Sequence, residues 1–290
     1  MTEFHLMLPQ MRMTMDAIVD RARAAEEVGF TGIAFMDHLA PPMAEDKPMY
    51  DAMTTAAWVL ASTQRLTAGH LVLCDSFRHP AVLAREAVTL DHASGGRFEL
   101  GIGAGSVPEE FETFGITPVD RRVSRFAETL EVLKLLWSGE RVDYDGQFRH
   151  LSGAQQLPEP TRRIPIVIGG TGPRMMDLVA RHADWWNLPS DNADRLEELR
   201  PLAKPARVSV QHVVGYVPAG ADRDEIAAVA QRRFGWLKEV ALAFGTGPEL
   251  VEHFSRWRER GVERFYCWFT DFAAVDTISG FGAEVIGKCS

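Results

Sequence analysis

The chain has 290 residues, of which 46% are hydrophobic and 24% charged, and its formal net charge is −9. Such values are typical of a folded globular protein, and the acidic balance argues against a nucleic-acid binder, which needs a basic face for phosphates. No run of about 18 apolar residues occurs, so we expect no membrane-spanning helix. The start of the chain lacks the pattern of a signal peptide, and three scattered cysteines predict neither disulfides nor a zinc site. We therefore expect a cytoplasmic protein.

Short apolar runs alternate with amphipathic stretches along the chain, as in parallel β/α proteins. Eight apolar runs are predicted strands: 4–8, 31–36, 70–74, 98–102, 164–168, 185–188, 208–217 and 265–269. The predicted helices include 54–62, a helix that begins at Pro80, 119–138, a helix that ends near His182, 223–243 and 249–260.

Eight strands that mostly alternate with helices predict an α/β fold, a single (β/α)₈ TIM barrel domain over residues 1–290. The polar segment 140–163 is predicted as an insertion between the fourth and fifth strands. A doubly wound open sheet is the alternative, but its six or so strands would leave two predicted strands without a place.

In a TIM barrel, chemistry is located at the carboxyl ends of the strands. Asp37 and His38 follow the second predicted strand, and a histidine beside a carboxylate suits acid–base chemistry near neutral pH. The alternative is an aspartate that caps a turn, with the histidine packed beside it. After the third strand, Cys74 is predicted to be a small buried side chain, and Arg78 and His79 to belong to a helix start rather than a site.

A glycine-rich segment follows the fourth predicted strand. Residues 101–106 resemble a dinucleotide-binding fingerprint, but Ser106 stands where the third glycine is required. The small residues Gly103, Ala104 and Gly105 would still let a flat ligand approach the backbone closely.

A second glycine-rich segment follows the fifth predicted strand and runs into a helix. Its members are Gly169, Gly170, Thr171, Gly172 and Arg174. Exposed backbone N–H groups, a helix N-terminus and an arginine together predict a phosphate site. A glycine-rich turn with a solvated arginine is the alternative. The sequence contains no HExxH or GxSxG motif, so metal-dependent and serine hydrolysis are poorly supported, and we expect no metal.

Four segments, in this order, resemble the luciferase-like flavin and deazaflavin oxidoreductases. They are EEVGFTGIAFMDH (26–38), RHPAVLAREAVTLDHASGGRFELGIGAG (78–105), DRRVSRFAETLEVLKLLWSG (120–139) and IPIVIGGTGPRMMDLVARHADWWNL (164–188). The resemblance runs through most of the chain to about residue 190 and is diffuse after that. It implies a TIM barrel that binds coenzyme F420 or, alternatively, FMN at the carboxyl ends of its strands.

The resemblance also implies roles for individual residues. The cofactor ring would lie against a bulge in the third strand, with a non-prolyl cis peptide among His70, Leu71 and Val72. The segment 103–105 would pass beside the ring, and the phosphate would lie at 169–172 with Arg174 nearby. The pair Asp37-His38 resembles the F420-dependent branch, where the histidine stands near the centre of hydride transfer.

An oxidoreductase that moves hydride between F420 and an unidentified small organic substrate is therefore the expected function. The alternatives are an FMN-dependent monooxygenase fed by a partner reductase, a non-catalytic flavin-binding protein, and an unrelated barrel lyase or isomerase. Sugar-phosphate dehydrogenases of the branch carry Trp and Glu where this chain has Pro42 and Ser106. This departure argues against glucose 6-phosphate. We expect residues 47–51 and the loops after strands seven and eight to form the substrate pocket, and the chain to form a homodimer.

Overall fold

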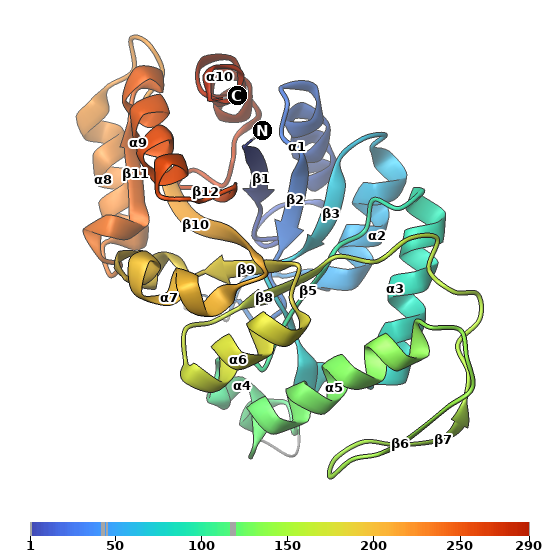
Figure 1. Ribbon diagram of the computed structural model, residues 1–290. Coiled ribbons are helices and arrows are strands. Elements are labelled where there is room, and N and C mark those ends of the chain that lie inside the picture. The colour runs from blue at the N-terminus through green and yellow to red at the C-terminus, as the bar shows by residue number, and fades with distance from the viewer. Residues whose placement is uncertain (1, 42–43, 45, 117–119, 290) are drawn as a thin grey trace.

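A parallel sheet curls into a nearly closed barrel, with helices around its outside (Figure 1). The computed structural model describes residues 2–41, 44, 46–116 and 120–289. The strands of the barrel sheet are β1 (Glu3–Met7), β2 (Gly32–Phe35), β3 (Thr67–His70), β4 (Leu73–Cys74), β5 (Leu100–Gly103), β8 (Ile166–Gly169), β9 (Trp185–Leu188), β10 (Arg207–Tyr216), β11 (Leu242–Gly245) and β12 (Arg264–Phe269). Their order is β3-β2-β1-β12-β10-β9-β8-β5-β4, with β11 beside β10. The predicted TIM barrel is thereby confirmed.

Helices follow most strands and cover the barrel. They are α1 (Met15–Glu27), α2 (Ala52–Ser62), α3 (Pro80–Ser94), α4 (Pro108–Thr113), α5 (Arg122–Leu136), α6 (Pro173–His182), α7 (Leu196–Ala203), α8 (Arg223–Phe234), α9 (Gly247–Glu259) and α10 (Val275–Glu284). Short 3₁₀ turns are η1 (Asp75–Phe77), η2 (Ser190–Arg195), η3 (Glu239–Ala241) and η4 (Ile286–Lys288). Within the described residues, no helix combines the length and the hydropathy needed to cross a bilayer.

The third barrel strand is divided into β3 and β4. β3 pairs with β2, β4 pairs with β5, and the peptide between Leu71 and Val72, which lies in the gap, is cis. Ala68 of β3 forms a bridge with Phe98, which brings the two ends of the sheet together. The predicted bulge and non-prolyl cis peptide are therefore confirmed.

The start of α3 illustrates how local sequence sets an element. Pro80 occupies the first turn, where a missing N–H costs no hydrogen bond, and the Nδ1 of His79 accepts from the backbone N–H of Ala81 at 3.2 Å. The predicted helix start at Pro80 is correct, and His79, predicted to belong to this helix start, is its cap. The helix ends at Gly95, whose φ of 66° favours glycine.

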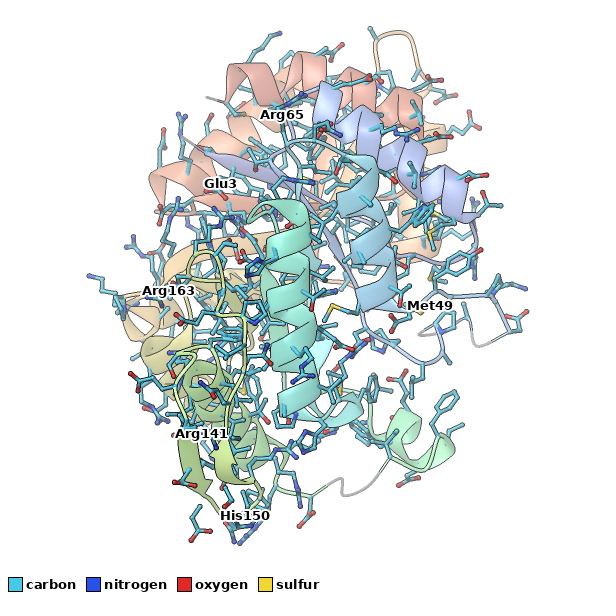
Figure 2. All side chains as sticks on the ribbon, turned by 90° about the vertical axis from the view of Figure 1, so that its right-hand side faces the viewer. Glu3, Met49, Arg65, Arg141, His150 and Arg163 are labelled. Atoms are coloured by element: carbon cyan, nitrogen blue, oxygen red, sulfur yellow. The ribbon has the colours of Figure 1, made fainter. Side chains whose placement is uncertain are left out.

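Two segments differ from their predictions. The predicted helix 223–243 is too long, because α8 ends before Gly235 and the chain then forms η3 and β11, which pairs with residues 213–216 of β10. The insertion 140–163 contains an antiparallel hairpin of β6 (Val142–Asp145) and β7 (His150–Ala154). Figure 2 shows the hairpin, with Arg141 and His150, at the lower end of the molecule.

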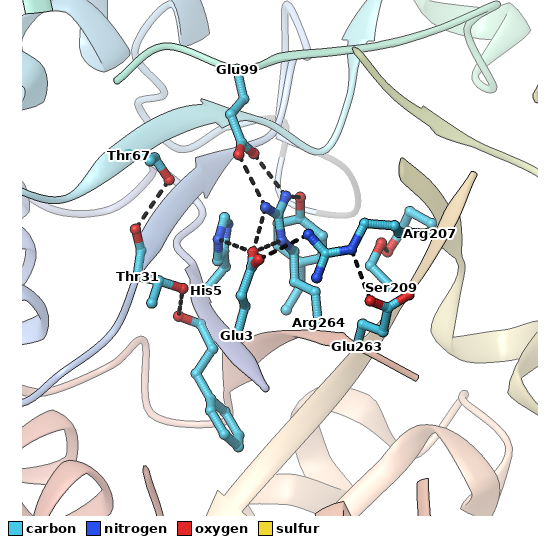
Figure 3. A network of polar contacts seen from close by, with 12 residues as sticks. Glu3, His5, Thr31, Thr67, Glu99, Arg207, Ser209, Glu263 and Arg264 are labelled. Carbon is cyan, nitrogen blue, oxygen red and sulfur yellow. Dashed lines mark hydrogen bonds and ion pairs between the residues drawn. The ribbon is translucent and has the colours of Figure 1, made fainter. Parts of the chain in front are cut away.

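The amino ends of the strands are closed by a buried ionic network (Figure 3). The guanidinium of Arg264, which is 3% exposed, contacts Oε2 of Glu3 at 2.5 Å and Oε2 of Glu99 at 2.7 Å. It also lies 3.8 Å from the ring centroid of Trp185. Burial would raise the pKa of Glu3, but the nearby His5 and the guanidinium of Arg264 outweigh burial and lower this pKa to about 2. One buried cation therefore holds two carboxylates at this end.

Candidate functional site

A cavity of about 380 Å³ opens at the carboxyl ends of the strands. That volume is within the range of small-molecule sites. Residues from the carboxyl ends of six strands, from the middle of β10 and from α4 to α6 line it: Asp37, His38, Leu71, Val72, Leu73, Cys74, Gly103, Ala104, Gly105, Ser106, Val107, Glu110, Phe111, Val123, Gly169, Gly170, Met175, Asn187, Pro189 and Gln211. Nine predicted site residues are therefore brought together around one cavity.

His38 lies on the cavity wall and is held there by Glu110 of α4. Its Nδ1 is 3.1 Å from Oε2 of Glu110, and the side chains are 20% and 8% exposed. The other oxygen of Glu110 accepts from the backbone N–H groups of Leu39 and Ala40. One carboxylate thus orients both the ring and the loop that carries it. Glu110 was not predicted from the sequence.

The hydrogen bond with Glu110 also determines which nitrogen of His38 carries a proton. An ionised carboxylate only accepts hydrogen bonds, so Nδ1 is the donor and Nε2 of the neutral ring is an acceptor. Nε2 has no hydrogen-bond partner among the described residues. The neutral ring is therefore able to accept a proton from a molecule in the cavity, and the protonated ring is able to return it.

Asp37, the carboxylate next to His38 in sequence, has a different partner from the one that the sequence suggested. Its two oxygens accept from Nη1 and Nη2 of Arg78 at 2.5 and 3.1 Å, and Oδ2 also accepts from the N–H of Cys74 at 2.8 Å. Arg78 contacts Asp51 at 3.1 Å as well. Arg78, predicted to belong to a helix start rather than to the site, does not line the cavity, but it neutralises a buried carboxylate of the cavity wall.

The wall between β4 and β5 is built for close approach. Leu71 and Val72 form one side, and a Cβ added at Gly103 would lie 2.9 Å from Cγ2 of Val72. Behind this wall, a Cβ at Gly101 would lie 1.7 Å from the carbonyl oxygen of His70. Glycine is required at 101 for the bulge to pack, and a side chain at 103 would fill the space beside Val72.

The predicted phosphate segment is only partly in the cavity wall. Gly169 and Gly170 line it, and Gly170 has a φ of 131°. Gly172 is the N-cap of α6, with no side chain capping the helix, while Arg174 is exposed and donates from Nη2 to Ser124 Oγ at 2.7 Å. These residues, with Thr171, extend from the cavity wall to the N-terminus of α6 at the surface, beside the guanidinium of Arg174. This chemistry suits an anion at the mouth.

The remaining residues that the sequence singled out differ in whether they reach the cavity. Cys74 is buried, and burial raises the pKa of its thiol to about 12, as expected for an inert side chain. Residues 47–51, predicted for the substrate pocket, do not line the cavity, and Tyr50 donates its N–H to the carbonyl of Gln10 at 3.0 Å. Ser106 lines the cavity, whereas Pro42 lies outside the described residues.

The sequence analysis also missed two amides of the cavity wall, Asn187 and Gln211. Asn187 lies in the predicted strand 185–188, and its Oδ1 lies 3.3 Å from the hydroxyl of Ser209. Both residues belong to strands β9 and β10, whose alternation of inward and outward side chains was the available signal. Their amides supply polar groups opposite the wall formed by Leu71 and Val72.

Comparisons with known proteins agree with this geometry. The family model of the luciferase-like monooxygenases matches residues 1–268. An F420-dependent glucose-6-phosphate dehydrogenase of Microbacterium testaceum is 31% identical over 214 residues, which cover 72% of this chain and 61% of that enzyme. The chain thus spans less than two thirds of this relative. An uncharacterized protein of Mycobacterium bovis is 30% identical over 253 residues, which cover 78% of this chain and 87% of that protein.

Solved structures share the fold at lower identity. An F420-dependent secondary alcohol dehydrogenase in complex with an F420–acetone adduct superposes with a TM-score of 0.86 at 19% identity, covering 100% of this chain and 99% of that one. A monooxygenase from Streptomyces bottropensis superposes with a TM-score of 0.82 at 20% identity, covering 99% of this chain and 100% of that one. At these identities the likeness establishes the barrel architecture.

Proposed function

We propose that this chain, which belongs to the luciferase-like monooxygenase family, is an oxidoreductase that uses coenzyme F420 and a small organic substrate. The observation that carries the proposal is the arrangement of His38, fixed through Nδ1 by Glu110, on the wall of a cavity beside Leu71 and Val72. A group that can transfer a proton, His38, therefore lies beside a wall against which a flat ring can pack. Relatives named as F420-dependent support this cofactor over FMN.

The donor set of the cavity fits such a cofactor. We assign the ring to the wall of Leu71, Val72 and the segment 103–105, and the phosphate to the segment 169–172 with Arg174. When bound, F420 supplies or accepts the hydride. The walls around it are mostly apolar, which limits the access of water to the reacting centre.

His38 moves the proton that accompanies the hydride. When a substrate carbinol is oxidised, its carbon gives up a hydride and its hydroxyl gives up a proton, which passes to Nε2 of His38. In the reverse direction the protonated ring returns this proton to the carbonyl oxygen. Glu110 stabilises the protonated ring, because its carboxylate accepts the hydrogen bond from Nδ1 at 3.1 Å.

The charge of the cavity wall bears on the substrate. No lysine or arginine is among its lining residues within the part of the chain that the structure describes. A phosphorylated sugar would find no cation among these lining residues, and the guanidinium of Arg78, which contacts the lining residue Asp37, is already engaged by that carboxylate. We therefore propose an unphosphorylated substrate, unlike the one named for the Microbacterium dehydrogenase.

Anaerobic titration tests the proposal. We expect oxidised F420 to bind and to be reduced, with loss of its visible absorbance, when a panel of secondary alcohols is added, and glucose 6-phosphate to be inactive. Binding of FMN with no binding of F420 would contradict the cofactor assignment. Reduction by glucose 6-phosphate alone would contradict the substrate assignment. The homodimer and the partner reductase stay predictions. Sedimentation of the purified protein tests the homodimer.

A further inference from the structure

Two amide side chains of the cavity wall, those of Asn187 and Gln211, have hydrogen-bonding groups that the protein itself does not use. Oδ1 of Asn187 faces the hydroxyl of Ser209 at 3.3 Å, and Nδ2 has no partner within the described residues. The amide of Gln211 has no hydrogen-bond partner in the same part of the chain. These free atoms are not among the enclosed ones, so they are open to the cavity that both residues line.

Gln10, which follows β1 at the same end of the barrel, shows the opposite case. Its Nε2 donates to the carbonyls of Met36 and Tyr50 at 2.5 and 3.0 Å, and its Oε1 accepts from the N–H of Met36 at 3.3 Å. The protein alone satisfies this buried amide, which therefore has a structural role. An unmet amide costs free energy, so the free groups of Asn187, which is 3% exposed, and of Gln211 need partners from water or from a ligand.

The order of the strands places the two amides opposite the groups assigned to the reaction. Because β3 and β4 together form one strand of the barrel, β10 lies four strands from it in either direction, and β9 lies four strands from β2. Gln211 of β10 is therefore across the cavity from Leu71 and Val72, and Asn187 of β9 is across it from His38. A substrate that turns its reacting carbon to the ring turns its other end to the amides.

The charge of the cavity limits what the amides bind. No lysine or arginine lines the cavity within the residues that the structure describes. A carboxylate or phosphate held by Asn187 and Gln211 would therefore be desolvated without a countercharge, which is unfavourable. The free N–H groups of the two amides match an uncharged oxygen instead, and the carbonyl of Gln211 also accepts from a hydroxyl.

We propose that Asn187 and Gln211 form a subsite for a second, uncharged oxygen group of the substrate. The inference rests on the proposed function: one hydroxyl of the substrate gives its proton to His38, and the amides hold the other group. The substrate is then a hydroxy compound with a further hydroxyl, carbonyl or amide, and neither a simple alkanol nor a hydroxy acid. Two points of contact orient the carbinol carbon toward the ring.

Four small alcohols that share a methyl group and a carbinol test the subsite. They are isopropanol, propylene glycol, lactamide and lactate, whose second group is a methyl, a hydroxymethyl, a carboxamide and a carboxylate. We expect kcat/KM for reduction of F420 to be roughly tenfold higher with propylene glycol and lactamide than with isopropanol, and lowest with lactate. Equal values for isopropanol and the two uncharged probes, or a preference for lactate, would refute the subsite.

Substitution of the amides connects this preference to the two residues. Gln211→Met removes the amide at nearly the same side-chain length, and we expect it to lower kcat/KM for propylene glycol and lactamide to the level of isopropanol. Asn187→Leu should act in the same direction, and the hydroxyl of Ser209 keeps the carbonyl of Trp186 at 3.0 Å. Gln64→Met is the matched control, because Gln64 is exposed and does not line the cavity.

A binding measurement separates recognition from turnover. Reduced F420 accepts no hydride, so lactamide forms an unreactive complex with it. Lactamide should therefore raise the melting temperature of this form of the wild type and leave that of Gln211→Met unchanged. Weaker binding of F420 to Gln211→Met, with the preference for lactamide retained, would assign the amide to the cofactor and refute the inference.

The outcomes for the inference and for the proposed function are distinct. If all four alcohols reduce F420 equally well, the subsite is refuted while F420 dependence stands. If F420 neither binds nor is reduced, the proposed function fails and the subsite with it. Melting curves without ligand identify loss of folding in Asn187→Leu, and Gln211→Met, at a half-buried position, carries the comparison in that case.

Discussion

The two ends of the barrel contain the same kinds of residue in opposite environments. At the amino ends of the strands, His5 is 2% exposed and lies 3.7 Å from Glu3, and Arg264 is enclosed by Glu3 and Glu99. At the carboxyl ends, His38 is 20% exposed and shares Glu110 with backbone N–H groups only. Burial and the charge of Arg264 lower the pKa of His5, so that this ring stays neutral. A histidine–carboxylate pair therefore stabilises one end, whereas at the other it faces a cavity and is available for chemistry.

Removal of the imidazole of His38, at the carboxyl ends of the strands, should have the largest effect. We expect His38→Ala to lower turnover by roughly 10²–10⁴-fold, the range of a general acid or base, with little loss of stability. Single-turnover oxidation of reduced cofactor and a melting curve measure the two effects. His150→Ala is the matched control, because His150 also faces a carboxylate, Asp145 at 2.9 Å, but lies on the hairpin. Equal rates for both variants would remove His38 from the mechanism.

Removal of the cation at the closed end should affect stability and leave the chemistry intact. Arg264→Leu leaves the buried Glu99 without its partner and removes one of the two arginines that contact Glu3, and we expect the free energy of unfolding to fall by about 3–5 kcal/mol. Chemical denaturation measures this loss. Arg207→Leu removes a second contact of Glu3, at 3.3 Å, from a half-exposed side chain, and should cost less than about 1 kcal/mol. A loss of turnover per folded molecule in Arg264→Leu would contradict the separation of the two ends.

Gly101 lies between the two ends, and its substitution should affect both stability and binding. In Gly101→Ala the Cβ meets the carbonyl oxygen of His70, and the backbone has to move at a cost of about 1–3 kcal/mol. Since this movement displaces the wall of Leu71 and Val72, we also expect weaker cofactor binding. Gly287→Ala, where no atom lies within 4 Å, should change neither quantity. Unchanged melting of Gly101→Ala would show that the wall adapts.

The smallest expected effect is a loss of stability in acid, caused by protonation of Glu3 at the amino ends of the strands. The pKa of Glu3 is about 2 in the folded protein, below its ordinary value of 4.5. Its contribution to stability is therefore complete above pH 4.5 and is lost as the pH falls toward 2. Melting temperatures measured across this interval should fall more steeply for the wild type than for Glu3→Gln. Parallel curves for the two proteins would mean that other carboxylates dominate.

The fold was predictable where burial makes a pattern that repeats. Eight apolar runs correspond to the barrel strands because a parallel strand covered on both faces is apolar throughout. β6 and β7 were missed because both are short and half-exposed. β11 was read as the end of a helix, since residues 236–244 are apolar enough for either structure and the ladder with β10 decides between them.

The site was predictable to the extent that it follows strand ends. His38, the segment 103–105 and Gly169 reach the cavity because each lies at a carboxyl end of the barrel. Glu110 was missed because it is 72 residues from His38, and a contact over that distance leaves no local pattern. Two acidic residues directly after Pro108, in a segment that follows a strand, were the only available signal. The partner of Asp37, Arg78, is 41 residues away and was missed for the same reason.

The bond from Cys74 N–H to Asp37 has a consequence for local motion. β2 pairs with β3, and β4 pairs with β5. Where the third strand is divided, the carboxylate of Asp37 therefore takes the place of a backbone carbonyl as hydrogen-bond acceptor. A hydrogen bond between two backbone groups is kept in almost any side-chain substitution, whereas the hydrogen bond from Cys74 to Asp37 is lost in Asp37→Ala. Asp37→Ala should therefore loosen the barrel locally, where β3 and β4 are divided. The hydrogen-exchange rate of the Cys74 amide would report this local opening separately from unfolding of the whole chain.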